Sequence, residues 1–320
     1  MTVLKKLFLK VRNLFDASLL DTRLAYGQNV ALRKMLGIPK YLALPVWQQH
    51  GWYEDGFLFP PDFKDARLAG MMLVYSEKKR REWEARSDIS CRVGGLVLAR
   101  YRRYMGWERR PDAKGTVFYA AHATSDTKVS YSVDRIHEVL SALPAEFKPV
   151  VVSLHPYDYY ELKMNEEYER LGYEVVTAGP ATSPDFPERF YEILSSCKYA
   201  CSNDVGTYIL YSLEMGIPFF FIGERVVNIL SEDNFNDLPA GEFRFDDRES
   251  GKEVFRLFDT GPATAVTPEQ RSWFERESGA GKEIPLEELR KIVTRPDRIL
   301  IATVKMFFFH LAAGLRRIDK

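Results

Sequence analysis

Cysteine is scarce in this chain, and the few copies form no recognisable framework. They are Cys91, Cys197 and Cys201, an odd number with no pairing typical of disulfides, which indicates a reducing compartment. Cys197 and Cys201 are close in sequence, but no second Cys or His pair lies nearby to complete a zinc site. We therefore expect free, buried thiols.

Neither sign of charge is in excess, and long apolar runs are missing. The 45 basic residues balance the 45 acidic ones, so the composition gives no reason to expect nucleic-acid binding. The best candidate for a membrane span, 299–318, is interrupted by Lys, His and Arg side chains. Lys10 and Arg12 interrupt the apolar N-terminal residues, so no signal peptide is predicted.

Several motifs with known chemistry are also missing. The sequence has neither a Walker phosphate loop nor a GxGxxG turn, which argues against ATP and NAD as ligands. It has no GxSxG elbow, no HExxH, and no DxD run after an apolar strand. Asp246 and Asp247 lie in a loop-rich region and are expected to be solvated. We therefore predict that the protein needs neither a metal ion nor a resident cofactor.

What the chain does contain is an alternation of apolar strands and amphipathic helices. In the first part, strands are expected at 41–47, 70–76 and 91–98, and helices at 4–15, 21–37 and 77–86. In the second part, strands are expected at 115–121, 149–154, 173–179, 198–202 and 218–223, with helices at 133–143, 158–171, 186–197 and 206–215. This spacing predicts an α/β fold with parallel sheets and right-handed crossovers.

The alternation divides into two α/β units and a C-terminal helix. We predict an N-terminal domain at 1–110, a second domain at 111–290, and a helix at 291–320 that packs back on the first domain. The basic, aromatic stretch 101–114 is interpreted as the interdomain linker. The stretch 231–283 is expected to be loop-rich and acidic, with helical stretches around 268–277.

Polar residues of the second unit follow its strands at their carboxyl ends. His155 and Pro156 follow one strand, and Ser202, Asn203, Gly206 and Thr207 follow another and open a helix. In open α/β sheets this edge binds ligands, and a helix N-terminus favours an anion. Ser and Asn are also ordinary helix caps, so the turn alone does not decide. Glu214, near the end of that helix, is a candidate for binding ribose hydroxyls.

The first unit offers a cluster of ionisable groups after its first strand. His50, Glu54 and Asp55 lie in one short segment, and an imidazole or a carboxylate can deprotonate an acceptor hydroxyl. A polar turn with Gly51 and Gly56 at its special dihedral angles is the structural alternative. We interpret the segment as the acceptor side of a catalytic site.

Two resemblances follow from these motifs. The two units and the last helix resemble the GT-B glycosyltransferase architecture, with two Rossmann-like domains facing a cleft. The His155-Pro156 pair, the 202–207 turn and Glu54-Asp55-Gly56 resemble motifs of bacterial sialyltransferases. That resemblance implies Glu54 as the base and His155, Ser202 and Thr207 as contacts of the CMP phosphate.

Gln49-His50-Gly51, the segment LVYSEKKRREWE and a Val-Gly-Gly segment are similar to CDP-glycerol glycerophosphotransferases and capsule-polymer transferases. This second resemblance implies His50 as the base. It also implies a phosphate-contacting loop at His122 and Thr124.

From these observations we expect a metal-independent inverting glycosyltransferase of lipopolysaccharide or capsule polysaccharide biosynthesis. Its partners would be a nucleotide-sugar donor, CMP-linked in preference to UDP-linked, and a glycan or lipid-linked acceptor. A CDP-glycerol-type polyol-phosphate transferase, a nucleotide-sugar epimerase and a non-catalytic binding protein of the same fold are the alternatives. We expect a cytoplasmic protein held as a peripheral membrane protein at an anionic surface by 1–15 and 298–320, although a helix at 4–15 packed on the protein body fits equally.

Overall fold

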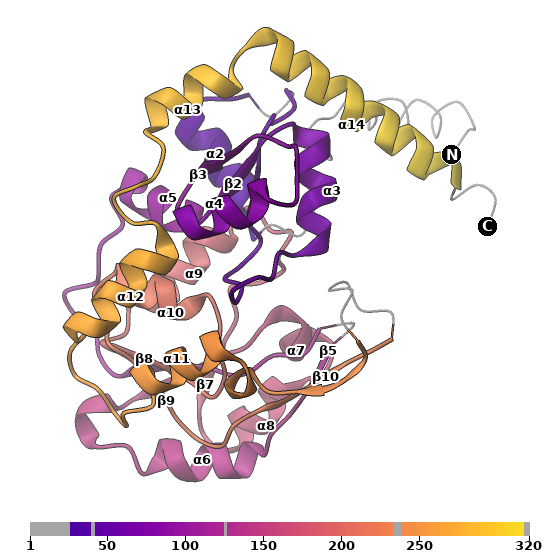
Figure 1. Cartoon of the computed structure of the whole chain (residues 1–320). Coiled ribbons are helices and arrows are strands. Elements are labelled where there is room, and N and C mark those ends of the chain that lie inside the picture. Colours follow the sequence, from indigo (N-terminus) through magenta and orange to yellow (C-terminus); the bar gives the residue numbers. More distant parts are fainter. Residues whose placement is uncertain (1–25, 40–41, 125–126, 233–238, 317–320) are drawn as a thin grey trace, which may run out of the picture.

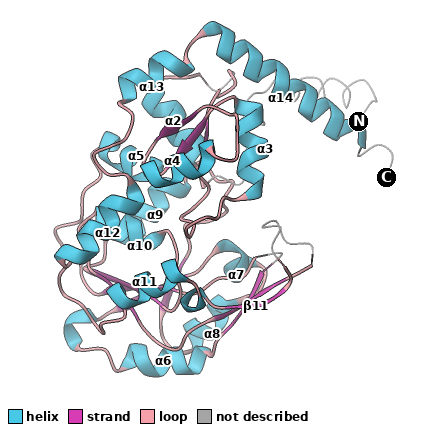
Figure 2. Cartoon of the chain, viewed as in Figure 1, coloured by secondary structure: helices cyan, strands magenta, loops and turns pink. Residues whose placement is uncertain are grey.

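A computed structural model describes residues 26–39, 42–124, 127–232 and 239–316 (Figure 1). The helix expected at 4–15 lies outside these residues. The strands form two parallel sheets and one small antiparallel sheet, and helices surround these sheets (Figure 2). The prediction of an α/β fold with parallel sheets is confirmed.

The first parallel sheet has the order β1-β2-β3. Its helices begin and end at residues suited to these positions: the Ser76 hydroxyl accepts a hydrogen bond from the Lys79 backbone N–H, and Gly70 ends a helix at a φ of 92°. The elements of this part are α2 (Gln28–Leu36), β1 (Trp47–Gln48), α3 (Pro60–Ala69), β2 (Met72–Val74), α4 (Glu77–Glu84), β3 (Cys91–Val93) and α5 (Val97–Met105).

The second parallel sheet has the order β7-β6-β4-β8-β9, which is Rossmann-like. Its central strands are apolar on both faces because helices cover both faces. The chain runs outward from β4 and then returns to the other side of β4, so the strand order reverses there. The elements are β4 (Thr116–Tyr119), α6 (Val133–Ser141), η2 (Ala145–Phe147), β6 (Val150–Ser153), α7 (Pro156–Tyr160), α8 (Met164–Arg170), β7 (Glu174–Val176), α9 (Phe186–Ser195), β8 (Tyr199–Ser202), α10 (Tyr208–Glu214) and β9 (Phe219–Phe221).

The remaining segments flank the two parallel sheets. An antiparallel sheet of order β11-β10-β5 extends from the second unit, α12 contacts α10, α13 contacts α2, and α14 packs on α3 (Figure 1). These elements are β5 (Thr127–Ser130), β10 (Val227–Leu230), β11 (Gly241–Phe243), η3 (Phe245–Asp247), α11 (Glu249–Phe258), α12 (Pro268–Ser278), α13 (Leu286–Val293) and α14 (Pro296–Arg316).

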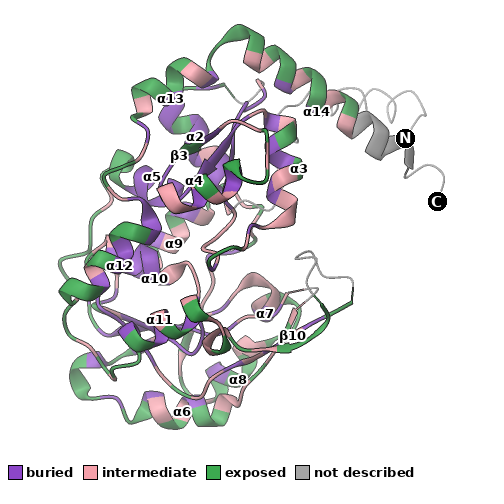
Figure 3. Ribbon diagram, viewed as in Figure 1, coloured by how far each residue is buried: buried purple, intermediate pink, exposed green. Residues whose placement is uncertain are grey.

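One hydrophobic cluster runs through the middle of the molecule and includes side chains from both parallel sheets. It joins Leu73 and Tyr75 near the first sheet to Val117 and Tyr119 of the second, through residues of α5, α9 and α10. Figure 3 shows buried residues along these elements. The three cysteines are buried and free, as expected. The domain boundaries at 110 and 290 stay predictions.

Three expectations were wrong in detail. The stretch 101–114 is not simply a linker, because α5 continues to Met105 and buries Arg100 and Arg102. These arginines are satisfied inside: the Arg100 guanidinium donates to the carbonyl of Gly94 at 3.0 Å. The helix expected at 158–171 is two helices, separated where Lys163 takes a left-handed conformation with φ of 56°. The third difference is α11, a helix in the stretch that was expected to be loop-rich, which buries Val254, Phe255 and Phe258.

Candidate functional site

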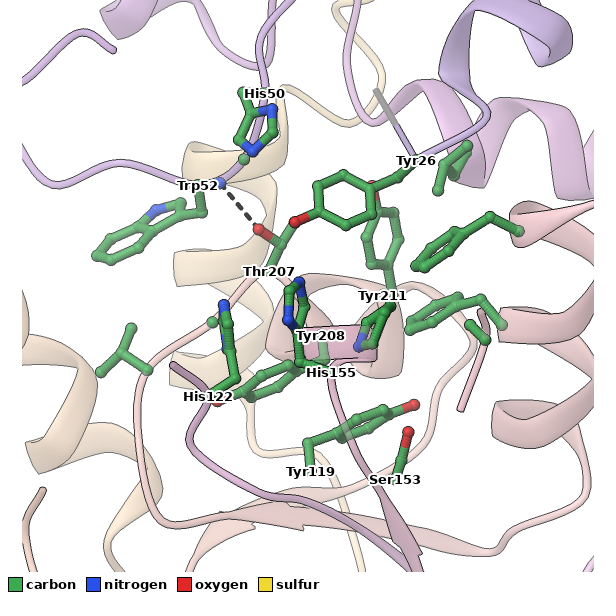
Figure 4. A pocket seen from close by; sticks show the side chains of 18 of the residues that line it. Tyr26, His50, Trp52, Tyr119, His122, Ser153, His155, Thr207, Tyr208 and Tyr211 are labelled. Atoms are coloured by element: carbon green, nitrogen blue, oxygen red, sulfur yellow. Dashed lines mark hydrogen bonds between the residues drawn. The ribbon is translucent and has the colours of Figure 1, made fainter. Parts of the chain in front are cut away.

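A cavity of about 300 Å³ lies where loops of the two parallel sheets meet (Figure 4). One wall comes from the carboxyl ends of β4 and β6 and from the start of α10. The opposite wall comes from the loop after β1 and from the chain before α2. The lining residues are Tyr26, Gln28, His50, Gly51, Trp52, Tyr53, Leu98, Tyr119, Ala120, His122, Ser153, Leu154, His155, Pro156, Ala178, Phe186, Phe190, Val205, Gly206, Thr207, Tyr208, Tyr211 and Phe245.

The topology of the second sheet explains this position. Strands β6 and β8 pair with β4 on its two sides, and all three run parallel. Their carboxyl ends therefore form one edge at the point where the strand order reverses, which is where open α/β sheets bind ligands. His122, His155 and the Gly206-Thr207 turn reach the cavity from this edge.

His155 and His122 form a stacked pair in the cavity wall. Their ring centroids are 4.5 Å apart. Burial, followed by the nearby His122 and His50, lowers the pKa of His155 to about 2, and burial lowers the pKa of His122 to about 4. Both imidazoles are therefore neutral at pH 7. Because the Tyr157 backbone N–H donates to Nδ1 of His155 at 3.3 Å, we assign the His155 proton to Nε2, which is then a hydrogen-bond donor.

Thr207 connects the two walls. The backbone N–H of Trp52 donates to Oγ1 of Thr207 at 2.9 Å (Figure 4). A Cβ atom at Gly51 would lie 3.2 Å from the same oxygen, so the loop approaches closely here. The Thr207 hydroxyl still has its own proton to donate to a ligand. Pro156 and Gly206 complete this part of the lining.

His50 enters the cavity wall from the loop after β1. Its ring lies near those of Tyr26 and Phe59, with centroids 5.2 Å and 5.0 Å away. Its backbone N–H donates to the buried carboxyl group of Asp62 at 3.2 Å. Asp62 also accepts from the Trp47 indole at 3.0 Å, and these bonds fix the path of the loop.

Glu54 and Asp55, the other candidate bases, are not among the residues that line this cavity. The Glu54 carboxylate forms an ion pair with Arg248, which precedes α11. The Asp55 carboxylate is exposed and lies 2.5 Å from the Lys78 ammonium. Their placement therefore supports roles in fastening the loop more than a role at the cavity.

Three of the predicted donor-binding residues are buried in the framework behind the cavity. Ser202 shares a hydrogen bond of 2.7 Å with the Tyr208 hydroxyl, and Asn203 accepts from the Ala121 backbone N–H at 2.8 Å. Glu214 pairs with Arg102 at 2.8 Å, on the far end of α10. These contacts favour positioning roles over direct contact with a ligand.

Thr124 lies in a second, adjoining cavity of about 190 Å³. His122, Val205, Tyr208 and Phe245 line both cavities, so the two are neighbours. The other residues lining the second cavity are Ala121, Thr124, Thr127, Asp204, Asn228, Leu230 and Phe243.

The sequence did not indicate how aromatic the larger cavity is. Tyr26, Tyr119, Tyr208 and Tyr211 line it, and no Lys, Arg, Asp or Glu side chain is among its described lining residues. The spacing of Tyr208 and Tyr211 along α10 is that of an ordinary buried helix face, so no pattern marked them as cavity residues. A phosphate in this cavity would be bound by imidazole, hydroxyl and backbone N–H groups.

Within the described ranges, no group of His, Cys, Asp and Glu is arranged to hold a metal ion. In the same part of the chain, no helix has the length and apolar character needed to cross a bilayer. Comparison of the chain with protein-family models, with curated proteins and with solved structures finds no match.

Proposed function

We propose that the protein is a GT-B-type glycosyltransferase that moves a sugar from a nucleotide-activated donor to a hydroxyl group of a surface glycan. One observation carries this proposal: His155 and Thr207, from the second sheet, and His50, from the first, line the same cavity. A transfer reaction needs a group that binds the donor phosphate and a base near the acceptor, and this pair of walls offers both.

On the donor side, Nε2–H of His155 and the hydroxyl of Thr207 are the proposed phosphate contacts. His122 and His155 are neutral without a ligand, and the negative charge of a phosphate would raise the pKa of each imidazole. The Nε2–H of His155 donates a hydrogen bond to the departing nucleotide phosphate and so stabilises its negative charge. No metal ion takes part in this mechanism.

On the acceptor side, His50 is the proposed base. Its ring lines the cavity, whereas the Glu54 carboxylate is paired with Arg248. The imidazole removes the acceptor proton while the acceptor oxygen bonds to the anomeric carbon of the donor sugar. The bond from this carbon to the phosphate oxygen breaks in the same inverting step, and the nucleotide leaves. The same observation favours a second candidate, CDP-glycerol-type transfer, because the second family resemblance has its base at His50.

We place the enzyme in the cytoplasm, as three free, buried thiols favour a reducing compartment. Its acceptor would be a glycan or a lipid-linked glycan. A non-catalytic protein of the same fold would bind the donor without consuming it, so turnover separates that alternative from the proposed one.

The experiment is a donor panel of CMP-sugars, UDP-sugars and CDP-glycerol, with thermal shift for binding and nucleotide release for turnover. His155→Ala should weaken nucleotide binding about tenfold or more, as a charge-assisted hydrogen bond is lost. His50→Ala should keep binding and lose transfer.

His137→Ala is the matched control, since this histidine is on α6 and contacts Tyr173 instead of the cavity. If no donor in the panel gives turnover or a thermal shift, the transferase proposal is rejected. Equal nucleotide binding by wild type and His155→Ala would reject the assignment of the phosphate contact. Release of CMP from a sugar donor or from CDP-glycerol decides between the two transfer reactions.

A further inference from the structure

Helix α14 presents an apolar face to solvent. Leu300, Ile301, Val304 and Phe308 are 64%, 52%, 44% and 61% exposed. They are four of the eight large hydrophobic residues classed as exposed in the described chain. Leu300 and Ile301 are adjacent, and Val304 and Phe308 follow four and eight residues after Leu300, which brings all four to one side of the helix. An apolar group of this size on one face of a surface helix indicates a contact with another body.

The opposite side of α14 is already occupied. Ala302 and Met306 are buried in a small hydrophobic cluster that includes Ala66 and Ala69 of α3. The helix extends along the edge of the molecule on this support (Figure 1). The side of α14 that carries Ala302 and Met306 packs on α3, so the apolar side with Leu300 and Phe308 faces solvent.

Basic side chains lie beside the apolar face. Arg298 and Lys305 of α14 follow one another along one flank, and the Lys305 ammonium donates to the Arg67 carbonyl of α3 at 3.1 Å. Lys64 and Arg67 of α3 are exposed next to them, and the Lys64 ammonium lies 5.1 Å from the centre of the Phe309 ring.

The acidic residues of these two helices do not cancel this charge. Asp62 and Asp65 of α3 are buried, and Asp297 of α14 pairs with Arg295 at 2.8 Å. The surface thus combines an apolar stripe with a flank of basic side chains that form no ion pair with a carboxylate of the described residues. This combination suits a bilayer that carries anionic headgroups, with the apolar residues among the upper acyl chains.

We infer that α14 lies flat on an anionic membrane surface and inserts Leu300, Ile301, Val304 and Phe308 into it. This inference goes beyond the proposed reaction and does not depend on it, because binding to vesicles is measured without donor or acceptor. A second copy of the chain is an alternative occupant, but the described residues of α3 and α14 offer no exposed, unpaired carboxylate to meet the basic side chains of a partner copy.

The test is sedimentation of the full chain with vesicles of phosphatidylcholine alone and with vesicles that also contain the anionic lipid phosphatidylglycerol. Wild type should bind the anionic vesicles and bind less as salt is raised. Val304→Glu/Phe308→Glu should weaken binding about tenfold or more, because burial of one large apolar side chain alone accounts for a factor of this order.

Leu162→Glu, at a residue 49% exposed between α7 and α8, is the matched control and should bind as wild type does. Arg298→Glu/Lys305→Glu should lower affinity for anionic vesicles and leave the weak affinity for neutral ones unchanged. Equal binding by wild type and Val304→Glu/Phe308→Glu overturns the inference. So does a dimer in light scattering that is lost in this variant, since it assigns the face to a second copy.

Discussion

Buried carboxyl groups surround the two cavities, and burial raises the pKa of each to about 7. They belong to Asp62, Asp158 and Asp204. In Asp158, one carboxyl oxygen accepts from the Ala123 backbone N–H at 3.2 Å and the other has no partner within the described residues. This carboxyl group therefore holds the loop that carries His122. Its ionised form is destabilised, because burial removes the charge from water.

Asp158→Asn tests this coupling through pH. Between the unfolded pKa near 3.8 and the folded pKa near 7, the folded state keeps a proton that the unfolded state loses, so stability falls as pH rises. The neutral amide removes this dependence. Relative to Asp158→Asn, wild type should lose on the order of 3 kcal/mol of unfolding free energy from pH 5 to pH 8.

Urea titrations at several pH values measure the effect, and Asp134→Asn, at an exposed position on α6, serves as the control. His122 and His155 act in the opposite direction, because their lowered pKa makes stability fall as pH drops below about 6.5. Both proteins contain these histidines, so the difference between wild type and variant isolates Asp158. Parallel pH profiles would contradict the assignment.

At this scale the sequence predicted some cavity residues and misplaced others. His155 and Thr207 were predictable because each follows a strand of a parallel sheet, and such strand ends meet at one edge. The surroundings of Glu54 were not predictable, because its partner Arg248 is far along the chain. Hydrophobic periodicity carries no information about such a distant ion pair.

The loop from Gln49 to Phe59 is the element that joins the two walls of the cavity. Trp52 donates from its backbone to Thr207 at 2.9 Å and from its indole to Glu277 of α12 at 3.1 Å. Glu54 pairs with Arg248 beside α11. Three contacts thus connect this loop of the first unit, which also carries His50, to the second unit.

A charge exchange distinguishes fastening from catalysis at Glu54. Glu54→Gln should lower the unfolding free energy by about 1–3 kcal/mol, because it leaves Arg248 without its partner charge. Glu54→Arg/Arg248→Glu restores an ion pair with its signs reversed. If Glu54 only fastens the loop, this double variant should recover stability and nucleotide turnover relative to either single variant.

A catalytic carboxylate at position 54 could not be replaced by an arginine. Turnover that stays lost in a double variant with recovered stability would therefore return Glu54 to the role of base. Thermal unfolding and nucleotide release on the same preparations give both readouts. Arg80→Glu, within an exposed network on α4, controls for the effect of charge reversal alone.

Element boundaries show where sequence patterns fail. Strands of the second sheet were predicted well, because continuous apolar runs such as 219–221 are typical of buried parallel strands. Helix α5 was not predicted because it is rich in arginine. The burial of Arg100 depends on hydrogen-bond acceptors in other segments, the carbonyls of Gly94 and Ile284. A composition rich in basic and aromatic residues predicts a linker until those acceptors are known.

At the scale of the whole molecule, the sequence predicted two units, and the structure joins them through a shared core. The largest hydrophobic cluster contains Leu73 of the first sheet and Val117 of the second. Because the core is continuous, we expect the unfolding of one unit to unfold the other, as in a single cooperative unit. Two domains joined only by a polar interface would instead unfold separately.

The chain contains a natural reporter in each parallel sheet. Cys91 is on β3 and Cys201 is on β8, and both thiols are buried and free. Burial raises the pKa of Cys91 to about 12 and raises that of Cys201 as well, so neither reacts with alkylating reagents while folded. A pulse of iodoacetamide in increasing urea, followed by peptide mass spectrometry, reports the unfolding of each sheet separately.

We expect Cys91 and Cys201 to become reactive at the same urea concentration. The sharper test is Phe147→Ala, because Phe147 is buried in a cluster formed by the second unit alone and its truncation should cost about 3–5 kcal/mol. If the shared core couples the units, this variant should move both midpoints to lower urea by the same amount. A shift confined to Cys201 would show that the two predicted domains unfold independently. The two walls of the cavity would then belong to domains that can separate.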